Sequence, residues 1–220
     1  MAIVSKGESE KLAEEEKPEK KENFAWEIIK TIIIVGLLVF FFRFFIIQPY
    51  YIIGSSMEPK FHNGNYLFID EVTYRFFEPK RGDIIVFKHP DETCVSYVET
   101  SPVLRNFFQG PCQNYIKRII GLPGETVKIE NGKVIVMNTD HPQGITLNEP
   151  YIEKSIQTSG KQTFTVGSSE YFVLGDNRHP NASSDSREWG LLNKKYIVGR
   201  GWLRLLPPDE AGFIKKPQYN

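Results

Sequence analysis

The sequence predicts an all-β domain, an antiparallel sheet or partly open barrel with a β-rich excursion, preceded by one amino-terminal transmembrane helix. After residue 50, short runs rich in Val, Ile, Tyr and Phe alternate with Gly, Pro and Asn, which is the pattern of strands and turns. That part of the sequence shows no long amphipathic helix. A long apolar run before it predicts the transmembrane helix.

Residues 1–23 are expected to form a disordered, charged cytoplasmic tail. They contain five Lys and seven Glu, with almost no large apolar residue after Val4, so they cannot bury a core. The whole chain has 220 residues and zero formal net charge. We therefore expect one or two domains and no nucleic-acid partner.

Residues 24–47 are predicted to span the membrane. Twelve uncharged residues begin at Thr31, and the apolar run resumes after Arg43 without a polar face at helical spacing. Lys30 and Arg43 can extend their charged ends towards lipid headgroups, and Trp26 suits a membrane interface. A helix from Thr31 to the end of this segment is about 25 Å long, which nearly crosses the hydrocarbon core. The twelve residues alone would also fit a buried core helix.

The orientation of this anchor follows from the nearby cations. Four lysines closely precede the apolar run, whereas only Lys60 lies within about twenty residues after Arg43, so the amino terminus is expected in the cytoplasm and the rest outside. The bulky sequence after the run lacks the small residues of a cleavage site, so the anchor should stay on the chain.

The outer domain is predicted to cover residues 48–208, with a smaller β excursion at 128–170 and a carboxyl-terminal tail at 209–220. An Asn-Gly pair at 131–132 stands between two apolar runs and is a strong hairpin signal. The strand-like segments are 66–72, 83–89, 114–121, 126–138, 170–176 and 196–207.

The two cysteines, Cys94 and Cys112, fall in the outer region. A disulfide between them would close a loop of about 18 residues and contribute about 3 kcal/mol, but two unpaired thiols remain an alternative. Together with four scattered histidines they form no metal-ligand pattern, and we expect no metal or cofactor.

Four segments are candidates for chemistry: GSSMEP (54–59), RGDIIVFKHP (81–90), NYIKRIIGLPGE (114–125) and LGDNRHPNASSDSREWG (174–190). Ser55 and Ser56 are adjacent to a Gly, where serine is usually a turn residue. Lys117 lies in a strand-like run and shares a face with Tyr115 and Ile119. If that face is buried, the pKa of Lys117 falls, and a neutral amine beside a serine is a competent general base. Alternatively, Lys117 points outward and Ile116 inward.

In this order behind an apolar span, the four segments resemble those of bacterial type I signal peptidase. The resemblance covers roughly residues 43–207 and rests on three motifs: Ser-Met-x-Pro at 56–59, Tyr-Ile-Lys-Arg at 115–118, and Gly-Asp-Asn-Arg at 175–178 followed by Ser-x-Asp-Ser-Arg at 183–187. It implies a serine endopeptidase, anchored by a single span in the bacterial cytoplasmic membrane, that removes signal peptides from exported preproteins. We expect a monomer with its catalytic domain outside the cytoplasm.

The resemblance also implies roles for individual residues. The serine directly before Met, Ser56, is the nucleophile, Lys117 is the general base, and Ser55 is a spacer in the turn. Where some relatives have a serine hydroxyl that assists the oxyanion hole, this chain has Gly54. The oxyanion hole should then use the Ser56 N–H with a second backbone donor from Gly54 or nearby.

The last motif is longer than usual in relatives, because four residues rather than two separate its halves. Counting back from Asp185 assigns Ser183 as the hydroxyl that orients the lysine amine, with Ser184 as the alternative. By the same resemblance, ion pairs of four residues support the site, although a solvated charged loop would also fit: Asp176, Arg178, Asp185 and Arg187.

A signal peptide can bind as an added strand beside the nucleophile, where backbone hydrogen bonds give affinity and side-chain pockets give specificity. Bulky pocket walls would suit small residues at two positions, as in Ala-x-Ala sites. The candidate substrate-binding residues are Tyr50, Ile52, Ile53, Met57, Phe61, Tyr115 and Ile116.

Two other functions compete with this interpretation. A self-cleaving repressor-like serine–lysine protease would need a DNA-binding module, and an amino-terminal membrane span argues against one. A non-catalytic, membrane-tethered β-domain that binds partners would tolerate loss of the dyad, whereas this chain retains both Ser56 and Lys117.

Overall fold

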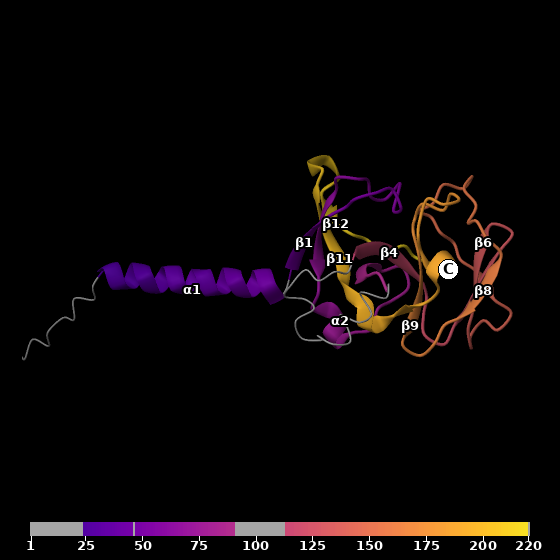
Figure 1. The fold of residues 1–220 in the computed structure, drawn as a ribbon, viewed down its shortest axis with the longest axis horizontal. Coiled ribbons are helices and arrows are strands. Elements are labelled where there is room, and N and C mark those ends of the chain that lie inside the picture. Colours follow the sequence, from indigo (N-terminus) through magenta and orange to yellow (C-terminus); the bar gives the residue numbers. More distant parts are fainter. Residues whose placement is uncertain (1–23, 46, 91–112, 220) are drawn as a thin grey trace, which may run out of the picture. The chain divides into compact units, whose positions relative to one another are not determined.

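The computed structural model describes residues 24–45, 47–90 and 113–219, and describes side chains in those ranges except for 40–48. Both cysteines, Cys94 and Cys112, lie outside the described residues. The chain divides into two compact units, Met1–Phe40 and Phe41–Asn220. The first contains most of helix α1 (Phe24–Phe45), and the second is built of β-strands (Figure 1).

Helix α1 ends two residues before the predicted boundary, and Ile47 begins the first strand. Pro49 lies within that strand and disfavours helical backbone at Gln48, so continuation of the helix beyond the predicted boundary is disfavoured. The apolar side chains from Ile28 to Val39 are exposed. In the described part of the chain, no helix combines the length and hydropathy that crossing a bilayer requires.

The larger sheet forms the body of the second unit. Its strands are β1 (Ile47–Tyr51), β2 (Tyr66–Asp70), β3 (Ile84–Lys88), β4 (Asn114–Gly121), β9 (Glu170–Leu174), β10 (Leu192–Asn193), β11 (Ile197–Leu206) and β12 (Gly212–Phe213). They run in the order β1-β2-β11-β3-β4-β9-β10, with β12 paired to β11. All described pairings are antiparallel, so the predicted all-β, antiparallel class is confirmed.

A smaller four-stranded sheet forms the excursion: β5 (Thr126–Glu130), β6 (Lys133–Met137), β7 (Ile145–Thr146) and β8 (Gln162–Thr165), in the order β7-β6-β5-β8. Strands β6 and β8 are labelled in Figure 1. Asn131 and Gly132 both have positive φ, at 51° and 75°, and join β5 to β6. This is the backbone that a two-residue Asn-Gly hairpin requires, so the predicted hairpin is confirmed.

Short helical turns complete the unit: α2 (Thr73–Phe76), α4 (Ser186–Trp189), and the 3₁₀ turns η2 (Lys194–Tyr196) and η3 (Pro208–Glu210). The carboxyl-terminal residues, expected as a tail, pack on the domain. Phe213 pairs with β11, and Ile214 packs against the core. Tyr219 lies against Gly82 and its hydroxyl is 3.2 Å from the Tyr151 hydroxyl.

Three buried clusters make up the core. One fills the space between the two sheets, where Phe172 and Leu174 of β9 pack with residues of β5 and β6. A second surrounds Phe87 and Ile119 on the larger sheet. The third joins the turn after β1 to strands β2 and β3, and it contains Ile52, Met57, Phe61, Leu67, Ile69, Ile84 and Val86. This third cluster holds the turn that carries the adjacent serines.

Candidate active site

Ser56 lies in the turn between β1 and β2, half-buried, whereas Ser55 is exposed. Gly54 has a φ of 100°, a conformation that favours glycine and turns the chain sharply before the serines. The next residue, Met57, is buried in the core and accepts a hydrogen bond from the Phe61 N–H at 2.9 Å. The core therefore anchors the turn immediately after Ser56.

Lys117 faces inward on strand β4, as one of the two sequence-based alternatives predicted. Its side chain is only 3% exposed. The amine Nζ donates to the Ser56 Oγ at 2.8 Å and to the Ile116 carbonyl at 3.0 Å. The two residues are 61 positions apart in the sequence, and the structure brings them into direct contact.

The Lys117 amine is held in a state suited to accept a proton. Burial lowers its pKa to about 8, because an ammonium loses hydration in the interior. The carboxylates of Asp185 and Asp176 oppose this shift, and Arg187 adds to it. A substantial fraction of the amine is therefore neutral slightly above physiological pH, which a lysine of ordinary pKa would not allow.

Three ion pairs, each with at least one fully buried partner, involve the segments that carry or contact Ser56 and Lys117. Arg118, the residue after Lys117, donates to both carboxylate oxygens of Asp176 at 2.7 and 2.5 Å. Arg178 is fully buried and pairs with Glu149 at 2.5 and 3.0 Å. Because each of these charges has a partner, they can be buried without the full penalty of an isolated ion.

The third pair joins Asp185 and Arg187 at 2.8 Å. Burial alone would raise the pKa of Asp185, but hydrogen bonds from Arg187 and from the Gly175 N–H outweigh it and lower the pKa. All four residues expected to support the site are thus in ion pairs. The sequence analysis assigned no role to Arg118 or Glu149.

Ser183 lies beside Gly175 with its Oγ buried. Its hydroxyl interacts with the Asp185 carboxylate and helps to lower the pKa of that group. The two bonds of the Lys117 amine go elsewhere, so the expected Ser183–Lys117 hydrogen bond is not observed. A Cβ on Gly175 would come within 2.4 Å of the Ser56 carbonyl oxygen and 2.2 Å of the Ser183 Oγ. Only glycine at this position lets both groups approach so closely.

The backbone donors near Ser56 differ in availability. The Gly54 N–H donates to the Asn63 Oδ1 at 3.0 Å and is therefore already occupied. In the described part of the chain, the N–H groups of Ser55 and Ser56 have no acceptor. Of the second donors that the sequence left open, Gly54 or a residue nearby, the Gly54 N–H is thus already hydrogen-bonded to Asn63 in this structure.

The residues expected to bind substrate differ in exposure. Ile53 is 84% exposed, and Tyr115 and Ile116 are half-buried. Tyr50 packs half-buried against the core, while three others are buried in it: Ile52, Met57 and Phe61. These three have little surface left to contact a substrate, because the core covers most of it.

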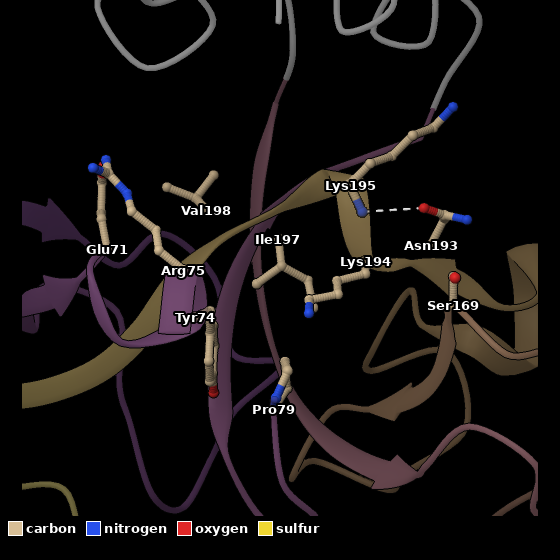
Figure 2. Close-up of a pocket in the computed structure, with 10 residues that line it drawn as sticks. All are labelled: Glu71, Tyr74, Arg75, Pro79, Ser169, Asn193, Lys194, Lys195, Ile197 and Val198. Carbon is tan, nitrogen blue, oxygen red and sulfur yellow. Dashed lines mark hydrogen bonds between the residues drawn. The ribbon is translucent and has the colours of Figure 1, made fainter. Parts of the chain in front are cut away.

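A pocket of about 360 Å³ lies elsewhere on the second unit, between α2, the turn η2 and the start of β11 (Figure 2). Its lining includes Tyr74, Arg75, Lys194 and Ile197, but neither Ser56 nor Lys117. It is therefore separate from the dyad. In the described part of the chain, no group of three or more His, Cys, Asp or Glu residues is placed to hold a metal ion.

A serine hydroxyl hydrogen-bonded to a buried lysine of lowered pKa is the arrangement found in serine–lysine hydrolases. Residues 25–206 match the family model described as "Signal peptidase, peptidase S26". The chain belongs to this family and is a serine endopeptidase.

Relatives along nearly the whole chain support this membership. The chain is 35% identical to a signal peptidase I from Leptolyngbya laminosa, over 90% of this chain and 88% of the relative. It is 34% identical to the probable signal peptidase I-1 of Synechocystis sp., over 85% of this chain and 87% of the relative. It is also 32% identical to signal peptidase I T of Bacillus subtilis, over 89% of this chain and 93% of the relative. A crystal structure of a signal peptidase I from Enterococcus faecalis is 29% identical and matches 56% of this chain and 97% of that chain, with a TM-score of 0.37.

Proposed function

We propose that this chain cleaves signal peptides from exported preproteins, with Ser56 as nucleophile and Lys117 as general base. The observation that carries this proposal is the 2.8 Å hydrogen bond between the Lys117 Nζ and the Ser56 Oγ inside a buried site. The membership of the signal peptidase family supports the substrate class.

The reaction begins with a neutral Lys117. Its amine takes the proton of the Ser56 hydroxyl as Oγ attacks the carbonyl carbon of the scissile peptide bond. The resulting tetrahedral intermediate carries its negative charge on the former carbonyl oxygen. The Lys117 ammonium then protonates the leaving nitrogen, the carbon–nitrogen bond breaks, and the mature protein departs with a new amino terminus. The signal peptide remains as an ester on Ser56.

Deacylation uses the same two residues. Lys117, again neutral, takes a proton from water as the water oxygen attacks the ester carbonyl. When this second intermediate collapses, the Ser56 oxygen leaves and receives the proton from Lys117. The signal peptide is released with a free carboxylate, and the enzyme returns to its starting state.

In this mechanism the oxyanion is stabilised by the Ser56 N–H. Gly54 supplies neither a hydroxyl nor a free N–H, because its N–H is bonded to Asn63. The unoccupied Ser55 N–H is the nearby candidate for a second donor. Ser183 is proposed to orient the Lys117 amine once substrate is bound, because its buried hydroxyl lies beside Gly175, which also contacts the Ser56 carbonyl.

Substrate would bind as an extended strand near Ile53, Tyr115 and Ile116, with main-chain hydrogen bonds to the enzyme. Bulky side chains leave room only for small substrate residues, which suits Ala-x-Ala sites. We infer that the segment 24–47 anchors a monomer in the bacterial cytoplasmic membrane, with residues 1–23 inside and the catalytic domain outside. The support for this topology is the apolar run and the distribution of lysines in the sequence.

The test is cleavage of a preprotein with an Ala-x-Ala site by the purified full chain in detergent. Ser56→Ala and Lys117→Ala should each reduce kcat by more than about 10³-fold. Ser55→Ala is the matched variant, because it removes the adjacent hydroxyl. Equal cleavage by the wild type and Ser56→Ala, or loss only in Ser55→Ala, would overturn the assignment.

A further inference from the structure

The peptide bond between Ser55 and Ser56 is held on one side only. Its carbonyl, that of Ser55, accepts hydrogen bonds from the Glu58 N–H at 3.1 Å and from the Asn177 Nδ2 at 3.1 Å. Its N–H, that of Ser56, has no acceptor in the described part of the chain. The bond is trans, so its carbonyl and N–H point in opposite directions. Fixing the carbonyl therefore fixes the direction of the free N–H.

The orientation of the Asn177 side chain is itself determined at both ends. Its Oδ1 accepts a hydrogen bond from the His179 N–H at 3.3 Å, which requires an oxygen there. Its Nδ2 faces the Ser55 carbonyl oxygen, which requires a donor. The two contacts agree on a single placement of the amide, so the donor is directed at Ser55.

The Asn177 backbone contacts the neighbouring peptide bond as well. Its N–H donates to the Ser56 carbonyl at 3.0 Å. This approach depends on Gly175, since a Cβ there would come within 2.4 Å of the same carbonyl oxygen. Asn177 thus binds the carbonyls of both serines, one through its side chain and one through its backbone.

We propose that Asn177 is a positioning residue that orients the Ser56 N–H for the oxyanion. This inference rests on the proposed function. Gly54 contributes no hydroxyl, and its N–H is bonded to Asn63, so the Ser56 N–H carries a large share of the oxyanion charge. A hydrogen bond to the carbonyl of a peptide also polarises its N–H, which strengthens donation to a negative oxygen. This hydrogen bond stabilises the transition state more than the bound substrate, because the negative charge on the oxygen develops only in the transition state.

Two substitutions separate the side-chain contact from the backbone contact. Asn177→Ala removes the bond to the Ser55 carbonyl but keeps the backbone N–H bond to Ser56. Asn177→Asp keeps an acceptor for the His179 N–H and replaces the donor by an oxygen. His179→Ala is the matched control, since it alters an exposed side chain in the same turn and keeps the backbone N–H that Asn177 accepts.

The experiment compares kcat, KM and inhibition by a peptide boronate, which forms a tetrahedral adduct with the serine and places an oxygen in the oxyanion hole. Both Asn177 variants should lower kcat about tenfold or more, less than the loss of a direct oxyanion donor. KM, and the Kd of a peptide blocked against cleavage by proline after the scissile bond, should change less than about twofold. The Ki of the boronate should rise by the same factor as kcat/KM falls. His179→Ala should match the wild type.

Three results would overturn the inference: wild-type kcat in Asn177→Asp, a loss confined to KM, or a fall in kcat with unchanged boronate affinity. If Asn177→Ala lowers Tm, the kinetics of Asn177→Asp provide the test, because this variant keeps an acceptor for the His179 N–H. Failure of the proposed function gives a different result, since the wild type and Ser56→Ala would then cleave the preprotein equally.

Discussion

The Arg118 guanidinium donates two hydrogen bonds to the Asp176 carboxylate in the interior of the domain, one residue beyond Lys117. Both residues are 1% exposed. Arg118 also donates to the Gly82 carbonyl and lies over the Tyr151 ring, 3.9 Å from its centroid. This pair joins strand β4, which carries Lys117, to the Gly-Asp-Asn-Arg segment, which contacts the turn that carries Ser56.

Replacing Asp176 by Asn should strongly destabilise the fold. The Arg118 charge would remain buried with a neutral partner, and breaking a buried pair costs about 3–5 kcal/mol. Urea denaturation of the purified chain measures the change. Glu130→Gln breaks a pair with Lys128 at the surface of the smaller sheet and should leave stability close to the wild-type value. Equal effects of the two substitutions would contradict the proposed importance of burial.

The pH dependence of kcat/KM should follow the Lys117 amine. Because burial lowers its pKa to about 8 and only the neutral amine accepts a proton, kcat/KM should rise with pH through a midpoint near that value. Asp185 raises the pKa, so Asp185→Asn should move the midpoint to lower pH. A profile measured with a soluble signal-peptide substrate provides the test. A midpoint near the ordinary lysine value of about 10.4 would contradict a buried base.

Replacing Lys117 by Met should stabilise the protein while removing activity. The folded-state pKa of Lys117 lies below the unfolded value, so the buried amine lowers stability below about pH 8, and this penalty disappears as pH rises towards about 10.4. Methionine has no charge to desolvate, and we expect a gain of about 1–3 kcal/mol at pH 7. The gain should shrink as the pH of the denaturation experiment is raised. Ser56→Ala is the control, because it keeps the buried amine; a less stable Lys117→Met at pH 7 would refute the prediction.

The carboxyl-terminal segment should contribute measurably to stability. Tyr219 packs against Gly82 and is within hydrogen-bonding distance of Tyr151, and Lys216 forms an ion pair with Asp83 at 2.5 Å. Tyr219→Ala should lower the free energy of unfolding by about 1–3 kcal/mol, because it removes a half-buried ring. Tyr219→Phe should cost about 1 kcal/mol or less, since only the hydroxyl contact is lost. Wild-type stability in Tyr219→Ala would contradict the expected contribution of this ring.

Much of the fold could be predicted from local sequence patterns. Each predicted strand segment contains an observed strand, and the Asn-Gly pair forms the predicted hairpin, because side-chain alternation and turn chemistry act over a few residues. The packing of residues after Pro208 was not predicted. Their contacts with Gly82 and Tyr151 depend on parts of the chain far away in sequence.

The candidate site shows the same division. The motifs marked Ser56 and Lys117 before any geometry was considered, but they left open whether Lys117 faced inward. Glu149 had no sequence signal, because it pairs with Arg178 from 29 positions away. Asn177 stood inside a recognised motif, yet its contacts with both serine carbonyls could not be read from its type or position.

The sequence by itself determined the β class, the apolar segment that precedes the β domain, and the family motifs from which Ser56 rather than Ser55 is proposed as nucleophile. Only the tertiary structure decided that the Lys117 amine is buried against Ser56, which charges are paired, and that Asn63 occupies the Gly54 N–H. The physical reason is that strand alternation and turns are set by neighbouring residues, whereas burial and hydrogen-bond partners depend on strand register. In the larger sheet that register pairs Ile85 with Lys117 and Arg118 with Leu174, and it brings segments about 60 residues apart into contact.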